Sequence, residues 1–336
     1  MAELPEMIQA LLEPKAYPEH PQGIELMQTQ MSFVFLTEDY AYKVKKPVNL
    51  GYLDYTTLGK RQFYCQREVE LNRRLCPDAY LGVVTVVKDN GDFRIADKGE
   101  AVEYVVKMRR LPQEAMMDAL LAGDRVSPPM LTGVAEKLAE FHHKAETSES
   151  ISAFGAILAV IQNTKENFTQ TEKYIGITIP RGQYDHIKSY TSHFLGAHTA
   201  LFEKRVADGR IRDCHGDLHA AHICFCDGIC IYDCIEFNDR FRYGDIASEV
   251  AFLAMDLDRY GRTDLSRHFV AAYVEKSHNE ELKQLLDFYK CYRAYVRGKV
   301  GGFKYDDPYI SLEEREKVLA DAKSYFELAE SYIEGD

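Results

Sequence analysis

The sequence has 336 residues, of which 46% are hydrophobic and 28% charged, enough for one large domain or two smaller ones with a buried core. Its formal net charge of −12 argues against general nucleic-acid binding, because an acidic surface repels the phosphate backbone. No apolar stretch approaches the ~20 residues that span a bilayer, and the amino terminus lacks the pattern of a secretory signal. We therefore expect a cytoplasmic protein without membrane contact.

The first part of the chain, residues 1–110, has the pattern of a small antiparallel sheet with one helix. Short β-type runs at 32–36 and 40–44 flank turn residues and predict a hairpin. A helix is expected over 57–75, where apolar residues recur at spacings of three and four. Two further runs, LGVVTVVKD and FRIAD, meet at an Asn-Gly turn, and AVEYVVKM completes a predicted sheet of five strands.

The second part, residues 111–336, has mainly helical patterns. Helices are expected at 114–121, 131–147, 183–207, 245–257, 264–277, 279–300 and 311–333. HICFC and ICIYD flank an Asp-Gly dipeptide and predict a tight β-hairpin within this part. The predicted fold class is therefore α+β, with a β-rich domain followed by a larger, mainly helical one.

One stretch, CHGDLHAAHICF, allows three interpretations. A zinc site would use His215, His219 and His222 with nearby cysteines. However, no CxxC pair is present, and the stretch leads into a strand, whose neighbouring side chains point to opposite faces. A plain core suits the cysteines, which we expect to be buried thiols rather than a disulfide framework. It does not suit Asp217, because an aspartate is costly to bury unless it is paired.

The third interpretation is a phosphoryl-transfer loop. Such a loop needs an aspartate to accept a hydroxyl proton, a metal ligand five positions later, and a second aspartate after the following hairpin. Asp217, His222 and Asp233 have this spacing, and the hairpin would bring its two ends together. We favour this interpretation, with a catalytic loop over 214–222 and a metal-binding hairpin over 222–236.

These residues resemble the aminoglycoside phosphotransferase-like branch of the protein-kinase-like superfamily. The family's His-Gly-Asp-Leu-His is intact as HGDLH, and its strand ending in Ile-Asp appears here as IYD at 231–233. KLAEFHH upstream and GDIASEVAFL downstream resemble two helices of the family, in matching order and spacing. Glu249 stands where the family has an aspartate, and the resemblance implies that it anchors the catalytic loop.

A narrower resemblance is to the amino-terminal half of bifunctional aminoglycoside phosphotransferase/ATP-binding proteins. It rests on YKVKKPV, LDYTTLGKRQ, REVELNRRL and DCIEFNDRFRYGDIASEVAFLAMDLD. The second half of those proteins is a P-loop kinase-like domain, and this sequence contains no GxxxxGK[ST]. A separate P-loop kinase-like partner is therefore an expectation.

The resemblance implies a bilobal kinase-like fold that binds ATP. Lys43 would hold the α- and β-phosphates, with Lys45 as its rival because it points to the same face. Glu68 on the inserted helix would pair with that lysine, with Glu70 as the alternative.

Two further parts of the nucleotide site follow from the resemblance. A hinge over 105–109, which includes Val106 and Met108, would meet adenine through its backbone groups. No glycine-rich loop precedes the strand at 32–36, so the segment TQMS, which ends at Ser32, would have to cover the phosphates.

The resemblance assigns Asp217 as the catalytic base within HGDLH, between His215 and His219, and Asp233 as the main Mg²⁺ ligand. His222 stands where the family has an asparagine. Neutral imidazole is a poor ligand for Mg²⁺ and a better one for Mn²⁺. This departure implies weaker metal binding, a preference for Mn²⁺ or an impaired enzyme.

The expected function is ATP-dependent phosphorylation of a hydroxyl group on a small molecule. The alternative is a nucleotide-binding pseudokinase that acts as a scaffold or regulator. The charge of the acceptor stays open, because Asp256 and Asp258 would attract a cation, whereas Arg293, Arg297 and Lys299 include candidates for binding an acidic group. We favour pairing of Arg293 and Arg297 with the two aspartates, since most charge clusters are structural.

Overall fold

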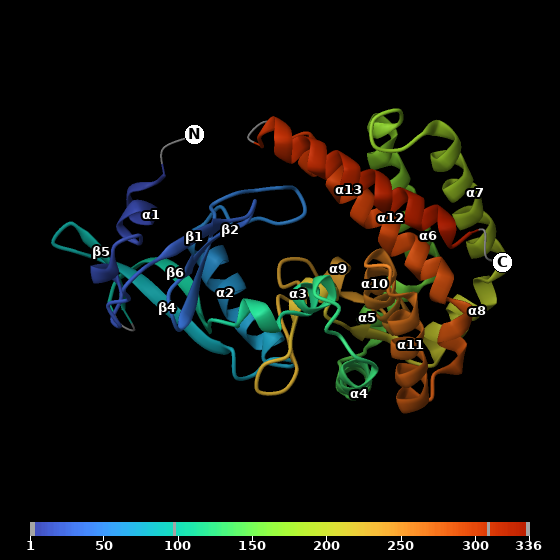
Figure 1. Ribbon diagram of the computed structural model, residues 1–336, viewed down its shortest axis with the longest axis horizontal. Helices are drawn as coiled ribbons and strands as arrows, with labels where there is room; N and C mark the ends of the chain where they lie inside the picture. The colour runs from blue at the N-terminus through green and yellow to red at the C-terminus, as the bar shows by residue number, and fades with distance from the viewer. Residues whose placement is uncertain (1–3, 97–98, 308–309, 334–336) are drawn as a thin grey trace. The chain divides into compact units, whose positions relative to one another are not determined.

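A computed structural model describes residues 4–96, 99–307 and 310–333 of the chain (Figure 1). The chain divides into two compact units, of which the first is Met1–Leu120 with Ala221–Asp239 and the second is Leu121–Ala220 with Arg240–Asp336. The segment 222–236, which the sequence places in the helical domain, therefore groups with the β-rich unit. The lobe boundary at residue 110 stays a prediction.

The first unit is built on a six-stranded antiparallel sheet with the order β1-β2-β3-β6-β4-β5. Its strands are β1 (Glu25–Gln28), β2 (Ser32–Leu36), β3 (Tyr40–Lys45), β4 (Tyr80–Asp89), β5 (Asp92–Ala96) and β6 (Ala101–Arg109). The five predicted strands are confirmed. β1 is an additional edge strand, and its mostly exposed side chains lack the alternation that marks a half-buried strand.

The two faces of β3 meet different surroundings, because successive side chains of a strand point to opposite faces. The unit also contains α1 (Glu6–Ala10), η1 (Pro14–Ala16), α2 (Leu58–Asn72), η2 (Gln113–Ala115), β8 (Ile223–Cys224) and β9 (Cys230–Ile231). Tyr42 and Val44 enter an apolar cluster that includes residues around α1. Lys43 and Lys45 point to the other face, where α2 lies. β8 and β9 form the predicted hairpin.

The second unit is mainly helical. Its helices are α4 (Pro128–Lys144), α5 (Glu149–Ser152), η3 (Ala153–Gly155), α6 (Ile157–Thr171), η4 (Glu172–Tyr174), α7 (Arg181–Ala197), α8 (Thr199–Ala207), α10 (Ile246–Arg259), α11 (Thr263–Ser277), η6 (Glu280–Gln284), α12 (Leu286–Tyr305) and α13 (Leu312–Ser331). β7 (Ile211–Asp213) pairs with β10 (Tyr243–Asp245). α3 (Met117–Ala122), η5 (Ala220–His222) and α9 (Asp239–Arg242) span the boundaries of the units along the chain. α12 packs against both α10 and α13, and Figure 1 shows α12 and α13 side by side.

Several helical predictions differ from the structure. The helix expected over 183–207 is divided into α7 and α8, which meet at His198. The helix expected over 279–300 is divided into η6 and α12, and α12 extends to Tyr305. α6 was not expected, because its buried face contains the polar residues Thr164, Asn167 and Thr171, which interrupt the apolar period. The α+β class is confirmed. Within the described ranges, no helix combines the length and apolar character needed to cross a membrane.

Candidate active site

Two lysines of β3 are held by one glutamate of α2. Lys43 Nζ lies 2.8 Å from Glu68 Oε1, and Lys45 Nζ lies 2.6 Å from Glu68 Oε2. Glu68 therefore forms the expected lysine–glutamate pair with both candidate lysines. Glu70, the alternative, is exposed and lies 3.6 Å from Arg67 on the same helix.

The two lysines differ in their other partners and in their exposure. Lys43 Nζ also donates to Asp233 Oδ1 at 2.7 Å, and 16% of its side chain is exposed. Lys45 is only 1% exposed and pairs with Glu236, which also accepts a hydrogen bond from Tyr55 OH at 2.6 Å. Of the two lysines, Lys43 is the one with surface available to a ligand. Glu236 and Tyr55 were not among the predicted site residues.

The contacts between these lysines and carboxylates keep Lys43, Lys45 and Glu68 in their charged forms. Burial acts to lower the pKa of both lysines, but Asp233 at Lys43, Glu236 at Lys45 and the shared Glu68 raise it well above its ordinary value. Burial acts to raise the pKa of Glu68, and the two lysines reverse this and lower it. The buried Glu68 carboxylate is thus charged and is neutralised by two cations, as a buried ion requires.

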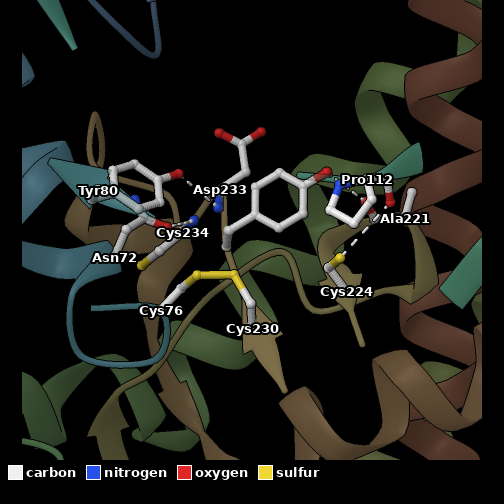
Figure 2. Close-up of a disulfide and its surroundings, with 10 residues drawn as sticks. Asn72, Cys76, Tyr80, Pro112, Ala221, Cys224, Cys230, Asp233 and Cys234 are labelled. Atoms are coloured by element: carbon white, nitrogen blue, oxygen red, sulfur yellow. Dashed lines mark hydrogen bonds between the residues drawn. A yellow bond between two sulfur atoms is a disulfide. The ribbon is translucent and has the colours of Figure 1, made fainter. Parts of the chain in front are cut away.

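The turn that carries Asp233 is attached to the α2 and β4 side of the unit (Figure 2). The Asp233 amide donates to Tyr80 OH at 3.2 Å, and the Cys234 amide donates to Asn72 Oδ1 at 2.8 Å. Asp233 has a φ of 61°, in the left-handed region that residues other than glycine rarely adopt. The two hydrogen bonds therefore hold a strained backbone that sets the direction of the Asp233 carboxylate.

A disulfide ties the same hairpin to the chain that follows α2. It joins Cys76 to Cys230, whose Cα atoms are 4.7 Å apart and whose side chains are buried (Figure 2). The remaining six cysteines are free thiols, so the chain has one bridge and no disulfide framework. The bridge was not predicted, and it removes the Cys230 thiolate from the ligands that a zinc site would use.

His222 lies beside Asp233, as predicted for residues at the two ends of a hairpin. His222 Nε2 is 3.6 Å from Asp233 Oδ2, while Asp233 Oδ1 accepts from Lys43. An imidazole nitrogen and a carboxylate oxygen this close together suit one divalent cation, and this donor pair suits Mn²⁺ better than Mg²⁺. The residues present therefore fit a divalent cation held by His222 and Asp233.

Ser32 follows the turn between β1 and β2, the segment that the sequence assigns to covering the phosphates. Its side chain is buried, and its amide donates to Thr29 Oγ1 at 3.0 Å. Thr29 Oγ1 also accepts from the Met31 amide at 3.2 Å, so the turn is closed by its own hydrogen bonds. The contact of Ser32 with phosphate stays a prediction.

The segment 105–109, which was predicted to be the hinge, is part of β6 and contains Val106 and Met108. Its role as a hinge stays a prediction. β6 pairs with β3 on one side and with β4 on the other, and the peptide groups of this segment therefore belong to the sheet ladder. Val106 lies directly opposite Lys43 in the register and shares its face of the sheet. The adenine contact of Val106 and Met108 stays a prediction.

In the second unit, Glu249 of α10 anchors the loop that leads to Asp217. Glu249 Oε1 accepts from the amides of His215 at 2.8 Å and Gly216 at 2.7 Å, and Glu249 Oε2 lies 2.7 Å from His142 Nε2. Gly216 has a φ of 90°, which glycine adopts without strain. Burial acts to raise the pKa of Glu249, but His142, His215 and the Gly216 amide lower it to about 2, so this buried anchor is charged.

Asp217 remains partly exposed on this anchored loop. Its side chain is 33% exposed, and its Oδ2 lies 3.5 Å from His219 Nε2. The Asp217 amide donates to His215 Nδ1 at 3.3 Å. Further along, the Ala220 amide donates to Asp256 Oδ2 at 2.8 Å, so α10 holds the loop on both sides of Asp217. A fixed, partly exposed carboxylate has the chemistry of a general base.

Comparison with known proteins shows the family to which the chain belongs. A family model described as the phosphotransferase enzyme family matches residues 108–289, which include Asp217 and Asp233. The chain belongs to this family. Uncharacterised proteins of Mycobacterium tuberculosis and Mycobacterium bovis are each 35% identical to it over 278 residues, or 82% of this chain and 54% of theirs. The chain thus spans about half the length of the curated relatives it matches.

Solved structures of other phosphotransferases are similar in fold. A choline/ethanolamine kinase family protein of Mesorhizobium loti is 13% identical, with a TM-score of 0.53 and 97% of each chain covered. A microcompartment-associated aminopropanol kinase is 15% identical, with a TM-score of 0.55 and coverage of 97% and 96%. The GDP complex of aminoglycoside 2′-phosphotransferase-IIIa is 13% identical, with a TM-score of 0.51 and coverage of 90% and 93%. The predicted kinase-like fold is confirmed.

Proposed function

We propose that this member of the phosphotransferase family is a cytoplasmic kinase that transfers the γ-phosphate of ATP to a hydroxyl group of a small molecule. The observation that carries the proposal is the position of Lys43, which contacts both Glu68 and Asp233. Kinases use a lysine held in this way to bind nucleotide phosphates beside a metal-binding aspartate. We assign this role to Lys43 because Lys45 is fully buried.

Asp233 and His222 would hold the divalent cation that accompanies ATP. In that position the cation would supply positive charge that offsets the negative charge of the nucleotide phosphates during transfer. Lys43 contacts Oδ1 of the Asp233 carboxylate, whereas His222 lies closer to Oδ2. The contact with Lys43 therefore uses a different oxygen from the one that faces His222.

Asp217 would accept the proton of the acceptor hydroxyl. As the new bond forms between the acceptor oxygen and the γ-phosphorus, the bond to the β-phosphate oxygen breaks and ADP leaves, while the proton passes to the Asp217 carboxylate. His215 and Glu249 would keep Asp217 in place, because they contact the backbone of its loop. Most of the rate enhancement in such a reaction comes from positioning and charge neutralisation.

A pseudokinase is the second candidate, and the observation that favours it is His222 beside Asp233. Imidazole in place of an oxygen ligand weakens binding of Mg²⁺. A pseudokinase would bind nucleotide without transferring phosphate, with or without the His222→Asn substitution. An active enzyme would instead transfer phosphate with at least one of the two metals, Mg²⁺ or Mn²⁺.

The experiment is a thermal-shift series with ATP, GTP and ADP, each with Mg²⁺, Mn²⁺ or no metal. A ligand that binds only the folded state stabilises it by about 2.7 kcal/mol at a hundredfold excess over its Kd. We expect a metal-dependent shift with ATP that is lost in Asp233→Ala and retained in Asp217→Asn. The exposed Asp92, which pairs with Lys15, supplies the control Asp92→Ala. Absence of any nucleotide shift would overturn the proposal.

A further inference from the structure

The acidic residues at the end of α10 are engaged inside the second unit. Asp258 Oδ2 accepts from Lys290 Nζ at 2.8 Å and from Tyr332 OH at 2.8 Å. Asp256 is buried and accepts from the Ala220 amide at 2.8 Å. The two aspartates that could have attracted a cationic acceptor therefore stabilise the protein itself.

Arg293 of α12 contacts the loop that carries Asp217 through neutral groups. Its Nη1 donates to the Gly216 carbonyl at 3.3 Å, and its Nε donates to Ser248 Oγ at 3.0 Å. Its guanidinium lies 4.8 Å from the centre of the Phe252 ring. Over the described part of the chain, Arg293 forms no ion pair with a carboxylate, so the expected pairing with Asp256 or Asp258 is wrong for this arginine.

Arg297 lies one helical turn further along α12, on the same face as Arg293. Its guanidinium is 5.5 Å from the centre of the Tyr325 ring, and within the described residues no carboxylate forms an ion pair with it. Burial acts to lower the pKa of Arg297, but Tyr325, Asp217 and Asp256 raise it above its ordinary value. Arg297 therefore remains a cation.

Two fully buried arginines of the second unit are each paired with a carboxylate. Arg205 pairs with Asp245 at 2.5 Å, and Arg242 pairs with Asp213 at 2.6 Å. A cation that leaves water is normally matched by a carboxylate, since an unmatched buried charge is costly. Arg293 and Arg297 are instead only partly buried, and no carboxylate forms an ion pair with either of them among the described residues. Arg293 contacts the residue before Asp217, the group proposed to receive the acceptor's proton.

We propose that Arg293 and Arg297 bind an anionic group of the acceptor, so that the substrate is a small hydroxylated molecule carrying a carboxylate or a phosphate. This inference rests on the proposed function, because it places the acceptor at Asp217. Guanidinium groups bind both anions through paired hydrogen bonds. Lys299 does not belong to this pair, because its Nζ donates to Asn167 at 2.7 Å and to Gln170 at 2.8 Å.

The test measures anion binding to the full chain by calorimetry, with glycerate as a carboxylate probe, inorganic phosphate as a phosphate probe, and chloride at matched ionic strength as the reference. We expect at least one probe to bind, and Arg297→Met to weaken its binding at least tenfold. Arg297→Lys should recover part of the affinity. The matched control is Arg259→Met, because Arg259 lies 5.3 Å from the same Tyr325 ring but pairs with Asp321 at 2.9 Å.

A second arm compares acceptors in the transfer reaction with ATP and Mn²⁺. Anionic candidates are glycerate, 3-phosphoglycerate and glucose 6-phosphate, and cationic candidates are choline, glucosamine and kanamycin. We expect transfer to an anionic acceptor, with Arg297→Met raising KM for that acceptor and not for ATP. The inference would be overturned if neither probe bound more strongly than chloride. It would also be overturned by phosphate transfer to a cationic acceptor that Arg297→Met does not affect. Absence of a nucleotide-dependent thermal shift in the wild type would instead overturn the proposed function. The calorimetry distinguishes the two failures, because it measures anion binding without nucleotide.

Discussion

The candidate site residues of the two units are held in place by different kinds of contact. In the first unit, charged side chains hold one another, with Lys43 and Lys45 both paired to Glu68. In the second unit, a charged side chain holds the backbone, because Glu249 accepts from two consecutive loop amides. The first arrangement contains charged groups that a nucleotide and its metal would also bind. The second uses the backbone amides before Asp217, and the Asp217 carboxylate takes no part in it.

This difference indicates which contacts a ligand can rearrange. In the proposed mechanism, metal binding at Asp233 would change the charge beside Lys43, and nucleotide phosphates would offer Lys43 an alternative to the carboxylates. The same mechanism assigns no ligand to the loop amides that Glu249 holds. We therefore expect the contacts of the first unit to respond to ligands and those of the Asp217 loop to stay fixed, and the variants below separate these behaviours.

The largest effect is expected for Lys45→Met. This substitution removes the cation between Glu68 and Glu236, both of which are buried, and leaves two carboxylates without it. Breaking a buried ion pair by removing one partner costs about 3–5 kcal/mol. Urea unfolding should show this loss in the free energy of unfolding.

Lys43→Met is the matched variant on the same strand. It should cost only about 1–2 kcal/mol, because Glu68 keeps Lys45 and Asp233 is partly exposed, yet it should abolish the nucleotide shift. A greater loss of stability in Lys43→Met than in Lys45→Met would contradict the division between a ligand-binding lysine and a structural one.

The next effect concerns the covalent tie, which joins the Asp233 hairpin to the chain after α2 and has no counterpart among the described contacts of the Asp217 loop. The Cys76–Cys230 bridge spans 154 residues of sequence, and a native disulfide typically contributes about 2–4 kcal/mol. Adding a reductant should lower the free energy of unfolding of the wild type by this amount and leave Cys76→Ser unchanged. Thiol counting on the denatured, unreduced protein is the check: eight free thiols would show that the bridge does not form.

Glu249→Gln tests the side chain that anchors the Asp217 loop in the second unit. The amide keeps an oxygen for the loop amides but loses the charge that faces His142, which should cost about 1–3 kcal/mol at pH 7. The folded-state pKa of Glu249, about 2, lies below the unfolded value of 4.5, so the unfolded chain binds more protons between these values. The charge of Glu249 thus stabilises the fold above pH 4.5, and this contribution is lost as pH falls toward 2.

Urea unfolding at pH 7, 5, 4 and 3 checks this prediction. The difference between wild type and Glu249→Gln should be constant from pH 7 to 5 and narrow below pH 4.5. A difference that does not change with pH would mean that the Glu249 charge contributes nothing to the anchor.

Local sequence signals were sufficient for five strands of the large sheet, for the β8–β9 hairpin and for the residues that share a motif. HGDLH and the hairpin after it located Asp217, His222 and Asp233, because turn residues and spacing determine where a hairpin's ends meet. Alternation placed Lys43 and Lys45 on one face of β3. It could not separate them, because their difference depends on burial beneath other segments of the chain.

The residues that sequence reasoning missed are joined by contacts between distant segments. Glu236 meets Tyr55 across 181 residues and meets Lys45 across 191. Neither spacing nor periodicity carries information over such a separation. The one local signal for Glu236 was a glutamate within the apolar run CIEF, where a buried charge needs a partner.

The smallest effect is expected for His222→Asn, which changes one proposed metal-binding side chain of the first unit. The substitution replaces an imidazole nitrogen 3.6 Å from Asp233 with an amide oxygen, the harder donor that Mg²⁺ prefers. We expect ATP affinity with Mg²⁺ to rise about tenfold, equivalent to about 1.4 kcal/mol, and affinity with Mn²⁺ to change less. Titration of each metal at fixed ATP measures the ratio. An unchanged Mg²⁺ to Mn²⁺ ratio would place His222 outside the metal site and leave Asp233 as its proposed ligand from this hairpin.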